Sequence, residues 1–221
     1  MFTLLMLGSG IFWTATYILI IRRSFLDHTY GMPLVALCAN ISWEGIFSFI
    51  YPPFIIQHVV NLVWFALDMV IFIQLLRYGP REFADLSKRA FYGVCSLTLL
   101  TGFGAVFLTT IEFHDSGVYS AFGQNLMMSV LFLTMLYRRR SLRGQSFSIA
   151  LCKLLGTAFA SLAFFLFSSL SHRSVLLPFL YVAIFVYDVI YLGMVYKQQR
   201  DLTGPFNNPI TESNQMEIPL S

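Results

Sequence analysis

The sequence predicts an all-α integral membrane protein with seven transmembrane helices. Of its 221 residues, 57% are hydrophobic and only 11% are charged, whereas a soluble domain carries about 25% charged residues. The mean hydropathy is +0.71. Long apolar runs recur along the chain, and most charged residues lie between them. Composition and pattern together are typical of a bundle of membrane-spanning helices.

Each predicted helix is an apolar segment close to the roughly 20 residues that a bilayer crossing requires. The first segment has no basic stretch before it, and its apolar run is too long for a cleaved signal sequence, so we interpret it as a helix of the mature protein. Residues 1–200 form the predicted transmembrane domain, and residues 201–221 a disordered cytosolic tail. The predicted spans are 2–21, 33–51, 58–76, 91–112, 119–137, 147–169 and 175–196.

The basic residues between the helices predict the orientation of the bundle. The loops after the second, fourth and sixth segments hold only Arg173, and all other loop cations lie in the alternate connections or the tail. Cytosolic loops carry the excess of Lys and Arg. We therefore expect a luminal or external N-terminus, a cytosolic C-terminus and an endoplasmic reticulum membrane. The cations on the predicted cytosolic side are Arg22, Arg23, Arg77, Arg81, Lys88, Arg89, Arg138, Arg139, Arg140, Arg143, Lys197 and Arg200.

Four ionisable residues lie deep within the predicted helices: Glu44, Asp68, Lys153 and Asp188. A charged group near the bilayer centre costs roughly 2.5–3.5 kcal/mol on insertion scales, and such residues usually face the bundle interior and mark a function. Asn40 precedes Glu44 by four residues and therefore shares its helix face. Lys153 is close to the predicted cytosolic end of its helix, where we expect its side chain to extend toward the membrane surface.

Other polar and aromatic residues extend these positions into stripes on four helices. Because the stripes carry three carboxyl groups, we expect them to line one cavity. The alternative is that they only hold the helices together, as polar side chains often do in membrane bundles. The stripes are formed by Asn40, Glu44 and Tyr51, by Asn61, Trp64 and Asp68, by Gln124 and Asn125, and by Tyr181, Asp188 and Tyr191.

Several common chemistries have no motif in this sequence. It contains no phosphate-binding Gly-rich loop with its lysine and no HExxH pair, no Cys/His metal set, and no Asp-rich diphosphate motif such as DDxxD. The three cysteines are predicted to be free thiols within apolar segments. The net charge of +3 is too small for a nucleic-acid-binding face. We therefore predict no metal site of these kinds and no nucleic-acid partner.

The remaining possibility is acid chemistry on an apolar substrate. Burial favours the neutral form of a carboxyl group, and a neutral acid can donate a proton. Aromatic faces stabilise cations by about 2 kcal/mol or more in a dry site. The candidate aromatic residues are Trp43, Trp64, Tyr187 and Tyr191, for which plain packing or contact with lipid is the alternative.

Four stretches of the sequence resemble the small integral-membrane terpene cyclases of fungal meroterpenoid and indole-diterpene pathways. They are "YGMPLVALCANISWE" (30–44), "NLVWFALDMVIF" (61–72), "GQNLMMSVLF" (123–132) and "YDVIYLG" (187–193). The resemblance implies a cofactor-free cyclase that protonates the epoxide, or a terminal alkene, of a prenyl chain on an aromatic or other polar head. The hydrophobic substrate would enter from the bilayer and cyclise through carbocations.

The resemblance also implies roles for particular residues. Glu44, which ends the N-x-x-W-E motif, and Asp188 match the two acidic residues that are essential in the family. Asp68 matches a third acid, for which we expect a supporting or orienting role together with Asn40 and Asn125. The predicted first, fourth and sixth helices give no confident match.

Two other functional classes remain open at this point. One is a seven-helix transporter whose carboxyl groups would bind a proton or a small solute near the bilayer midplane. Few Pro or Gly residues interrupt the predicted spans, which weakens that interpretation. The other is a non-catalytic membrane scaffold in which the carboxyl groups are assembly contacts.

Overall fold

A computed structural model describes residues 1–203 of the chain and shows only helices there, with no strand. α8 ends at Thr203, just past the predicted end of the domain, and residues 204–221 of the predicted tail lie outside the described residues. The elements are α1 (Phe2–Asp27), α2 (Leu34–Gly45), the π-helical η1 (Ile46–Ile50), α3 (Ile55–Glu82), α4 (Lys88–Glu112), α5 (Val118–Arg139), α6 (Phe147–Phe167), the short α7 (Ser169–His172) and α8 (Leu176–Thr203).

Six of these helices, α1, α3, α4, α5, α6 and α8, are long and apolar enough to cross a membrane. The predicted segment 33–51 corresponds to α2 and η1, which form a shorter apolar helix over Leu34–Ile50. At 1.5 Å per residue, 17 helical residues reach about 25 Å, less than the roughly 30 Å of the hydrocarbon core. The structure thus shows six membrane-length helices, and a seventh crossing stays a prediction.

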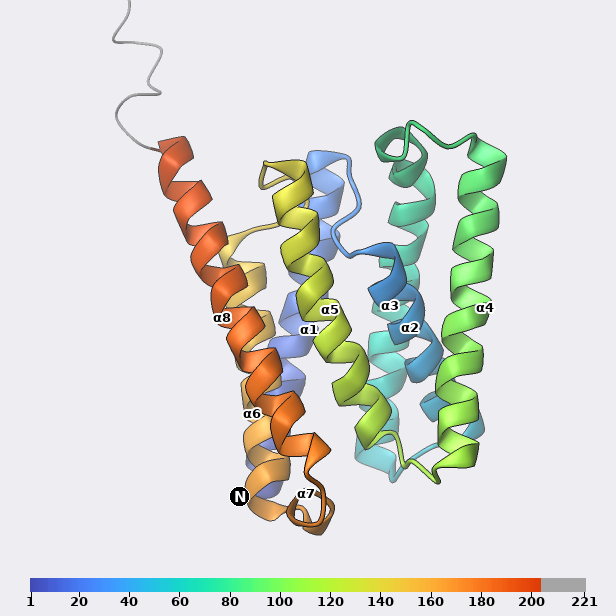
Figure 1. Ribbon diagram of the computed structural model, residues 1–221, viewed down its shortest axis with the longest axis vertical. Helices are drawn as coiled ribbons and strands as arrows, with labels where there is room; N and C mark the ends of the chain where they lie inside the picture. Colours follow the sequence, from blue (N-terminus) through green and yellow to red (C-terminus); the bar gives the residue numbers. More distant parts are fainter. Residues whose placement is uncertain (204–221) are drawn as a thin grey trace, which may run out of the picture.

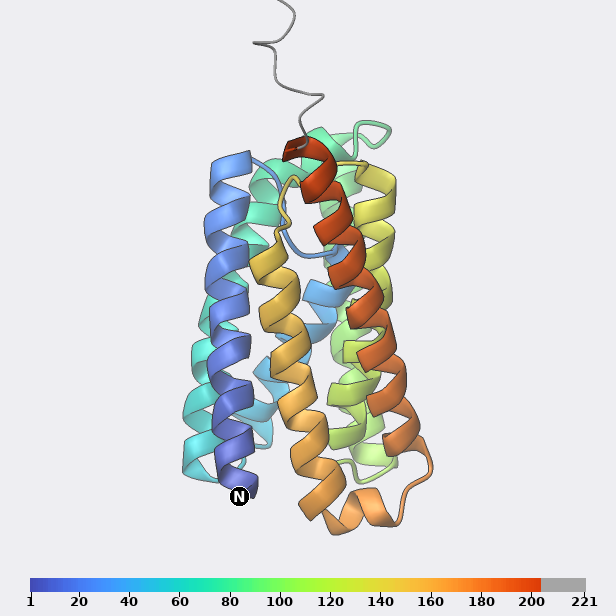
Figure 2. The same cartoon turned by 90° about the vertical axis from the view of Figure 1, so that its left-hand side faces the viewer.

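The contacts between the helices close into a ring. Figures 1 and 2 show its helices from the side. α1 packs between α3 and α6, α6 packs on α8, and α8 packs on α5. α2 completes the ring between α3 and α5, and α4 packs on its outer side. Glycine allows one close approach, since the Gly156 backbone of α6 lies against the indole of Trp13 in α1. The buried α2 is therefore surrounded by α3, α4 and α5.

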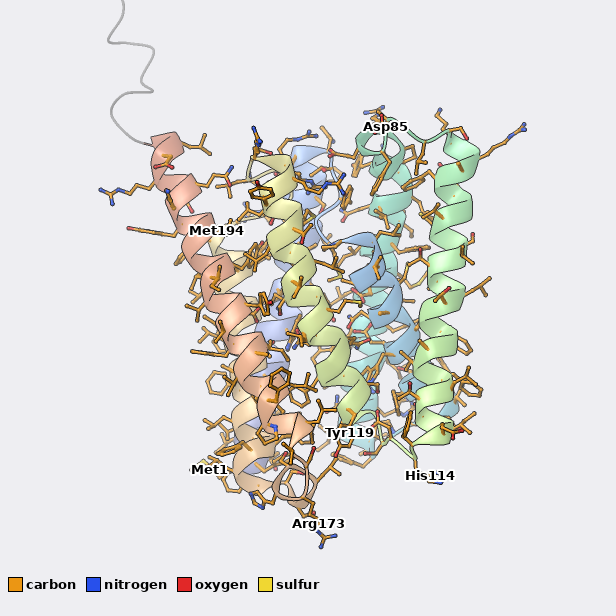
Figure 3. The ribbon with its side chains drawn as sticks, viewed as in Figure 1. Met1, Asp85, His114, Tyr119, Arg173 and Met194 are labelled. Atoms are coloured by element: carbon orange, nitrogen blue, oxygen red, sulfur yellow. The ribbon has the colours of Figure 1, made fainter. Side chains whose placement is uncertain are left out.

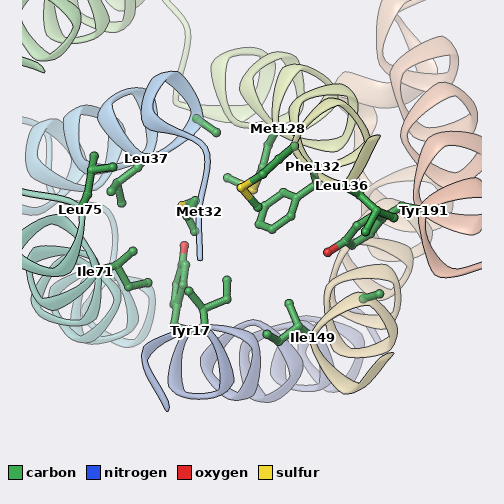
Figure 4. Close-up of a cluster of buried hydrophobic side chains, with 14 of the residues drawn as sticks. Tyr17, Met32, Leu37, Ile71, Leu75, Met128, Phe132, Leu136, Ile149 and Tyr191 are labelled. Atoms are coloured by element: carbon green, nitrogen blue, oxygen red, sulfur yellow. The ribbon is translucent and has the colours of Figure 1, made fainter. Parts of the chain in front are cut away.

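The largest buried apolar cluster fills the middle of this ring (Figure 4). Tyr17 from α1 and Met128 and Phe132 from α5 point into the space between the helices. Between membrane helices the alternative environment is lipid and not water, so these side chains stabilise the bundle by van der Waals packing.

Hydrogen bonds and an ion pair join the loops at the end of the bundle where α1, α3 and α5 end. The Gly144 N–H donates to Oδ2 of Asp27 at 2.7 Å, and the Arg139 guanidinium lies 4.1 Å from the centre of the Tyr30 ring. Glu82 at the end of α3 forms an ion pair with Arg143 at 3.2 Å. These contacts hold the connection that follows α1 against the ends of α3 and α5.

Gly144→Ala is expected to lower the free energy of unfolding by at least about 1–2 kcal/mol, because Gly144 has φ of +72° and L side chains disfavour that region. Its Cβ would also lie 2.7 Å from the Tyr30 carbonyl oxygen. Thermal denaturation in detergent would show the loss. Gly93→Ala is the matched control, since no atom lies within 4 Å of its Cβ position. Equal melting temperatures for the two variants would contradict the expected strain.

Candidate active site

Glu44 is part of a buried network that joins α1, α2 and α3. Its Oε1 accepts hydrogen bonds from the Tyr17 hydroxyl at 3.0 Å and from the Asn40 amide at 3.1 Å. The same amide nitrogen donates to Oδ2 of Asp68 at 2.8 Å and to the Tyr17 hydroxyl oxygen at 2.6 Å. Glu44 is 1% exposed and Asp68 is 0% exposed. The structure therefore brings Asn40 and Glu44 together, as their spacing predicts, and adds Asp68 and Tyr17 to them.

The electrostatics of this network favour a shared proton. In the part of the chain that the structure describes, no Lys, Arg or His forms an ion pair with Glu44 or Asp68. Two carboxylates around one amide in a dry site repel each other, so at least one neutral carboxyl group is favoured. Glu44 Oε2 and Asp68 Oδ1 are buried without a hydrogen-bond partner. The network therefore consists of two neighbouring carboxyl groups, each with one oxygen that accepts no hydrogen bond from another side chain or from the backbone.

η1 begins at Ile46, two residues after Glu44. In this π-helical turn the Tyr51 N–H donates to the Ile46 carbonyl oxygen, five residues earlier. Such turns occur frequently at functional sites, where they change the direction of side chains within a helix. The carboxyl group of Glu44 thus lies just before a local change of helix geometry.

Asp188 belongs to a second buried cluster, and here the prediction for Lys153 was wrong. Lys153 is 0% exposed and does not extend toward the membrane surface. Its Nζ donates to Oδ1 of Asp188 at 2.6 Å and to the Ser129 hydroxyl at 2.7 Å. The counter-charge on α8 explains the difference, because an ammonium group can remain in a dry interior when a carboxylate pairs with it.

Two neighbouring residues of α5 connect the clusters. The Gln124 amide donates to Oδ1 of Asn40 at 3.3 Å, while Oδ1 of Asn125 accepts from Lys153 at 3.5 Å and its amide donates to Thr157. Asn125, predicted to support the acid, therefore contacts the Asp188 cluster. The other polar residues of the predicted stripes form two clusters, which meet at the adjacent residues Gln124 and Asn125 of α5.

Three members of the stripes belong to neither cluster. Tyr51 is 43% exposed, Asn61 bonds to Gln57 and to the Phe47 carbonyl oxygen, and the Tyr181 hydroxyl pairs with that of Ser171.

Of the four candidate aromatic residues, Trp64 and Tyr191 lie beside the two buried clusters, and Trp43 and Tyr187 do not. Trp64 borders the Glu44 network, with its ring 6.2 Å from that of Tyr17 and its indole N–H bonded to Thr14. Tyr191 is buried, and its hydroxyl donates to Gln145 at 2.9 Å. Trp43 instead donates to the Gly117 carbonyl oxygen at the start of α5. Tyr187 is 37% exposed and lies on the outer surface of α8.

Sequence reasoning missed Trp13, Tyr17, Ser129 and Thr157 in these clusters, and it placed Lys153 at the membrane surface instead of beside Asp188. Trp13 lies 5.9 Å from Tyr17, ring to ring, and Nζ of Lys153 lies 5.8 Å from the Trp13 ring. Trp13 and Tyr17 are four residues apart, so the sequence alone could have indicated that they lie on one face of their helix. Three aromatic rings thus extend from Lys153 to Trp64.

Fold and site define a polytopic membrane protein with a buried acid network in a helix ring. The chain belongs to the Pyr4-like transmembrane terpene cyclases, whose sequence model matches residues 1–201. This membership confirms the resemblance, supports an enzyme of the terpene cyclase class, and does not favour the transporter alternative.

Several fungal terpene cyclases are similar to this chain. The Pyr4-family terpene cyclase mfmH of Annulohypoxylon moriforme is 31% identical over 167 residues, which cover 72% of this chain and 68% of mfmH. The terpene cyclase penB of Penicillium crustosum is 34% identical over 168 residues, covering 71% and 68%. The terpene cyclase macJ of Penicillium terrestre is 31% identical over 165 residues, covering 71% and 64%. No solved structure matches the chain.

Proposed function

We propose that the protein is a metal-independent membrane terpene cyclase that protonates the epoxide, or a terminal alkene, of a prenylated aromatic or related substrate. The observation that carries this proposal is the buried network of Glu44, Asp68, Asn40 and Tyr17, which contains two carboxyl groups and no ion pair to a cation among the described residues. No diphosphate leaves in such a reaction, so it needs no metal to stabilise a leaving group.

Glu44 is the proposed general acid. Tyr17 and Asn40 both donate to Oε1, which fixes the carboxyl group, and neither of them donates to Oε2, the oxygen that would carry the proton. Proton transfer to the epoxide oxygen opens a C–O bond, and the nearest alkene of the prenyl chain attacks the resulting cationic carbon. The two hydrogen bonds at Oε1 then stabilise the Glu44 carboxylate that forms.

Aromatic side chains beside the network are proposed to stabilise the carbocations. Trp64, Tyr17 and Trp13 form a series of rings 6.2 Å and 5.9 Å apart. Their faces can interact with a cation in a site that excludes water. Asp188 is the second proposed catalytic residue, and its cluster lies at the Trp13 end of this series.

The proposed orientation follows the distribution of charge. In Figure 3, Asp85 lies at one end of the bundle, whereas Met1, His114 and Arg173 lie at the opposite end. α1, α3, α5 and α8 all end on the Asp85 side, and their last turns and connections hold the basic residues named above. That end would face the cytosol, with the hydrophobic substrate entering from an endoplasmic reticulum bilayer.

Membranes containing the protein are expected to convert an epoxidised prenyl substrate to a cyclic isomer of equal mass. In D₂O, epoxide protonation places deuterium only on an exchangeable hydroxyl group, whereas alkene protonation leaves one carbon-bound deuterium. Mass spectrometry after exchange into H₂O distinguishes these cases, with membranes from a host lacking the protein as control. Cyclisation that requires release of diphosphate would contradict the proposal.

A further inference from the structure

Lys153 and Asp188 form a fully buried ion pair that the initiation step does not use. Both side chains are 1% exposed, and Nζ and Oδ1 are 2.6 Å apart. An unpaired ammonium group in such an interior is strongly unfavourable. The pair therefore keeps Asp188 as a carboxylate, in contrast to Glu44 and Asp68, which have no cation beside them. Two acidic sites with opposite environments are the usual sign of a separate acid and base.

The contacts of Lys153 leave little freedom to its ammonium group. Its nitrogen donates to Asp188, to the Ser129 hydroxyl at 2.7 Å and to the Asn125 carbonyl oxygen at 3.5 Å. An ammonium group has three N–H donors, so all of them are in use. The second oxygen of Asp188, Oδ2, is buried and has no hydrogen-bond partner. Lys153 thus holds Asp188 through Oδ1, while Oδ2 has no hydrogen-bond partner and can accept a proton.

The two sites are connected by the aromatic series and by α5. Nζ of Lys153 lies 5.8 Å from the Trp13 ring, and Trp13 lies beside Tyr17, which bonds to Glu44. A lone lysine here would repel a carbocation, but its pairing with Asp188 neutralises the charge. The arrangement places a proton donor at one end of an aromatic surface and a paired carboxylate at the other.

We propose that Lys153 is a positioning residue that holds Asp188 as the base that ends the cyclisation, an inference that rests on the proposed function. Asp188 Oδ2 takes a proton from the carbon next to the last carbocation, and the electrons of that C–H bond form the new alkene. Glu44 has given up one proton and Asp188 has gained one, so exchange with water restores both. The product remains an isomer of the substrate.

The test compares Lys153→Met, Asp188→Asn and the double variant by melting temperature and by product. Each single variant is expected to melt lower, because it leaves one buried charge unpaired. The double variant removes both charges and should regain most of the loss. It should still consume substrate through Glu44, yet form at least about tenfold less of the wild-type alkene. Other alkene isomers or a water adduct should replace it.

The outcomes separate a catalytic from a purely structural pair. A stable double variant that makes the wild-type alkene at the wild-type rate would overturn the inference, as would one that consumes no substrate, since initiation would then need Asp188. If the double variant does not fold, Asp188→Glu decides, because it keeps the ion pair but moves the free oxygen. A shifted product pattern supports the inference, and an unchanged one rejects it. Absence of any isomer from the wild-type protein would reject the proposed function itself.

Discussion

Glu44→Gln is expected to lower cyclisation by about 10²–10⁴-fold, the usual contribution of a positioned general acid. Glutamine has nearly the same shape, and its amide oxygen can still accept the hydrogen bonds that Tyr17 and Asn40 donate to Oε1. Its NH₂ group, however, cannot transfer a proton to an epoxide. The variant should therefore remain folded. The free energy of unfolding should change by about 1 kcal/mol or less, because an uncharged amide replaces an acid that is proposed to be uncharged.

Isomer formation per amount of folded protein is the measurement for this variant, together with its melting temperature in detergent. Glu112→Gln is a matched control, because Glu112 ends α4 with an exposed side chain. Asp68→Asn is a useful comparison, since it removes the second carboxyl group but leaves Glu44 in place. Wild-type turnover by Glu44→Gln would refute the assignment of the acid and return attention to Asp68.

The face of each helix could be predicted from the sequence, but the partner of each side chain could not. The spacing of Asn40 and Glu44 predicts one face of α2, and both indeed bond to each other. Periodicity leaves the axial position of one helix against another undetermined. The sequence therefore did not show that Asp68 contacts Asn40, while Asp188 pairs with Lys153 on α6.

Two further differences have physical causes that an apolar pattern does not contain. Leu34–Ile50 is short because Pro33 precedes α2 and Pro52 follows η1, and the surrounding helices bury it, so its apolar residues face protein as well as lipid. Lys153 is buried because a carboxylate from a distant segment compensates its charge. Apolar runs look alike in both settings, and hydropathy does not report the neighbour across an interface.

Asp188→Asn is expected to destabilise the protein by about 3–5 kcal/mol, the typical effect of removing one partner from a buried ion pair. Asparagine is close in size to aspartate, so packing changes little. Its carbonyl oxygen can still accept one hydrogen bond from Lys153, but it supplies no charge to balance the ammonium group. Ser129 and Asn125, the other acceptors of Lys153, are neutral as well.

Thermal denaturation in detergent, with retention of helical content below the transition, measures this loss. Asp201→Asn on the same helix is the matched control, because Asp201 is exposed and a surface charge contributes about 0–1 kcal/mol. If Asp188→Asn has the same melting temperature as the wild-type protein, the ion pair makes no net contribution to stability. The location of Lys153 in the interior would then have to be explained by catalysis alone, because an ion pair without stabilising effect still requires the desolvation of both charges.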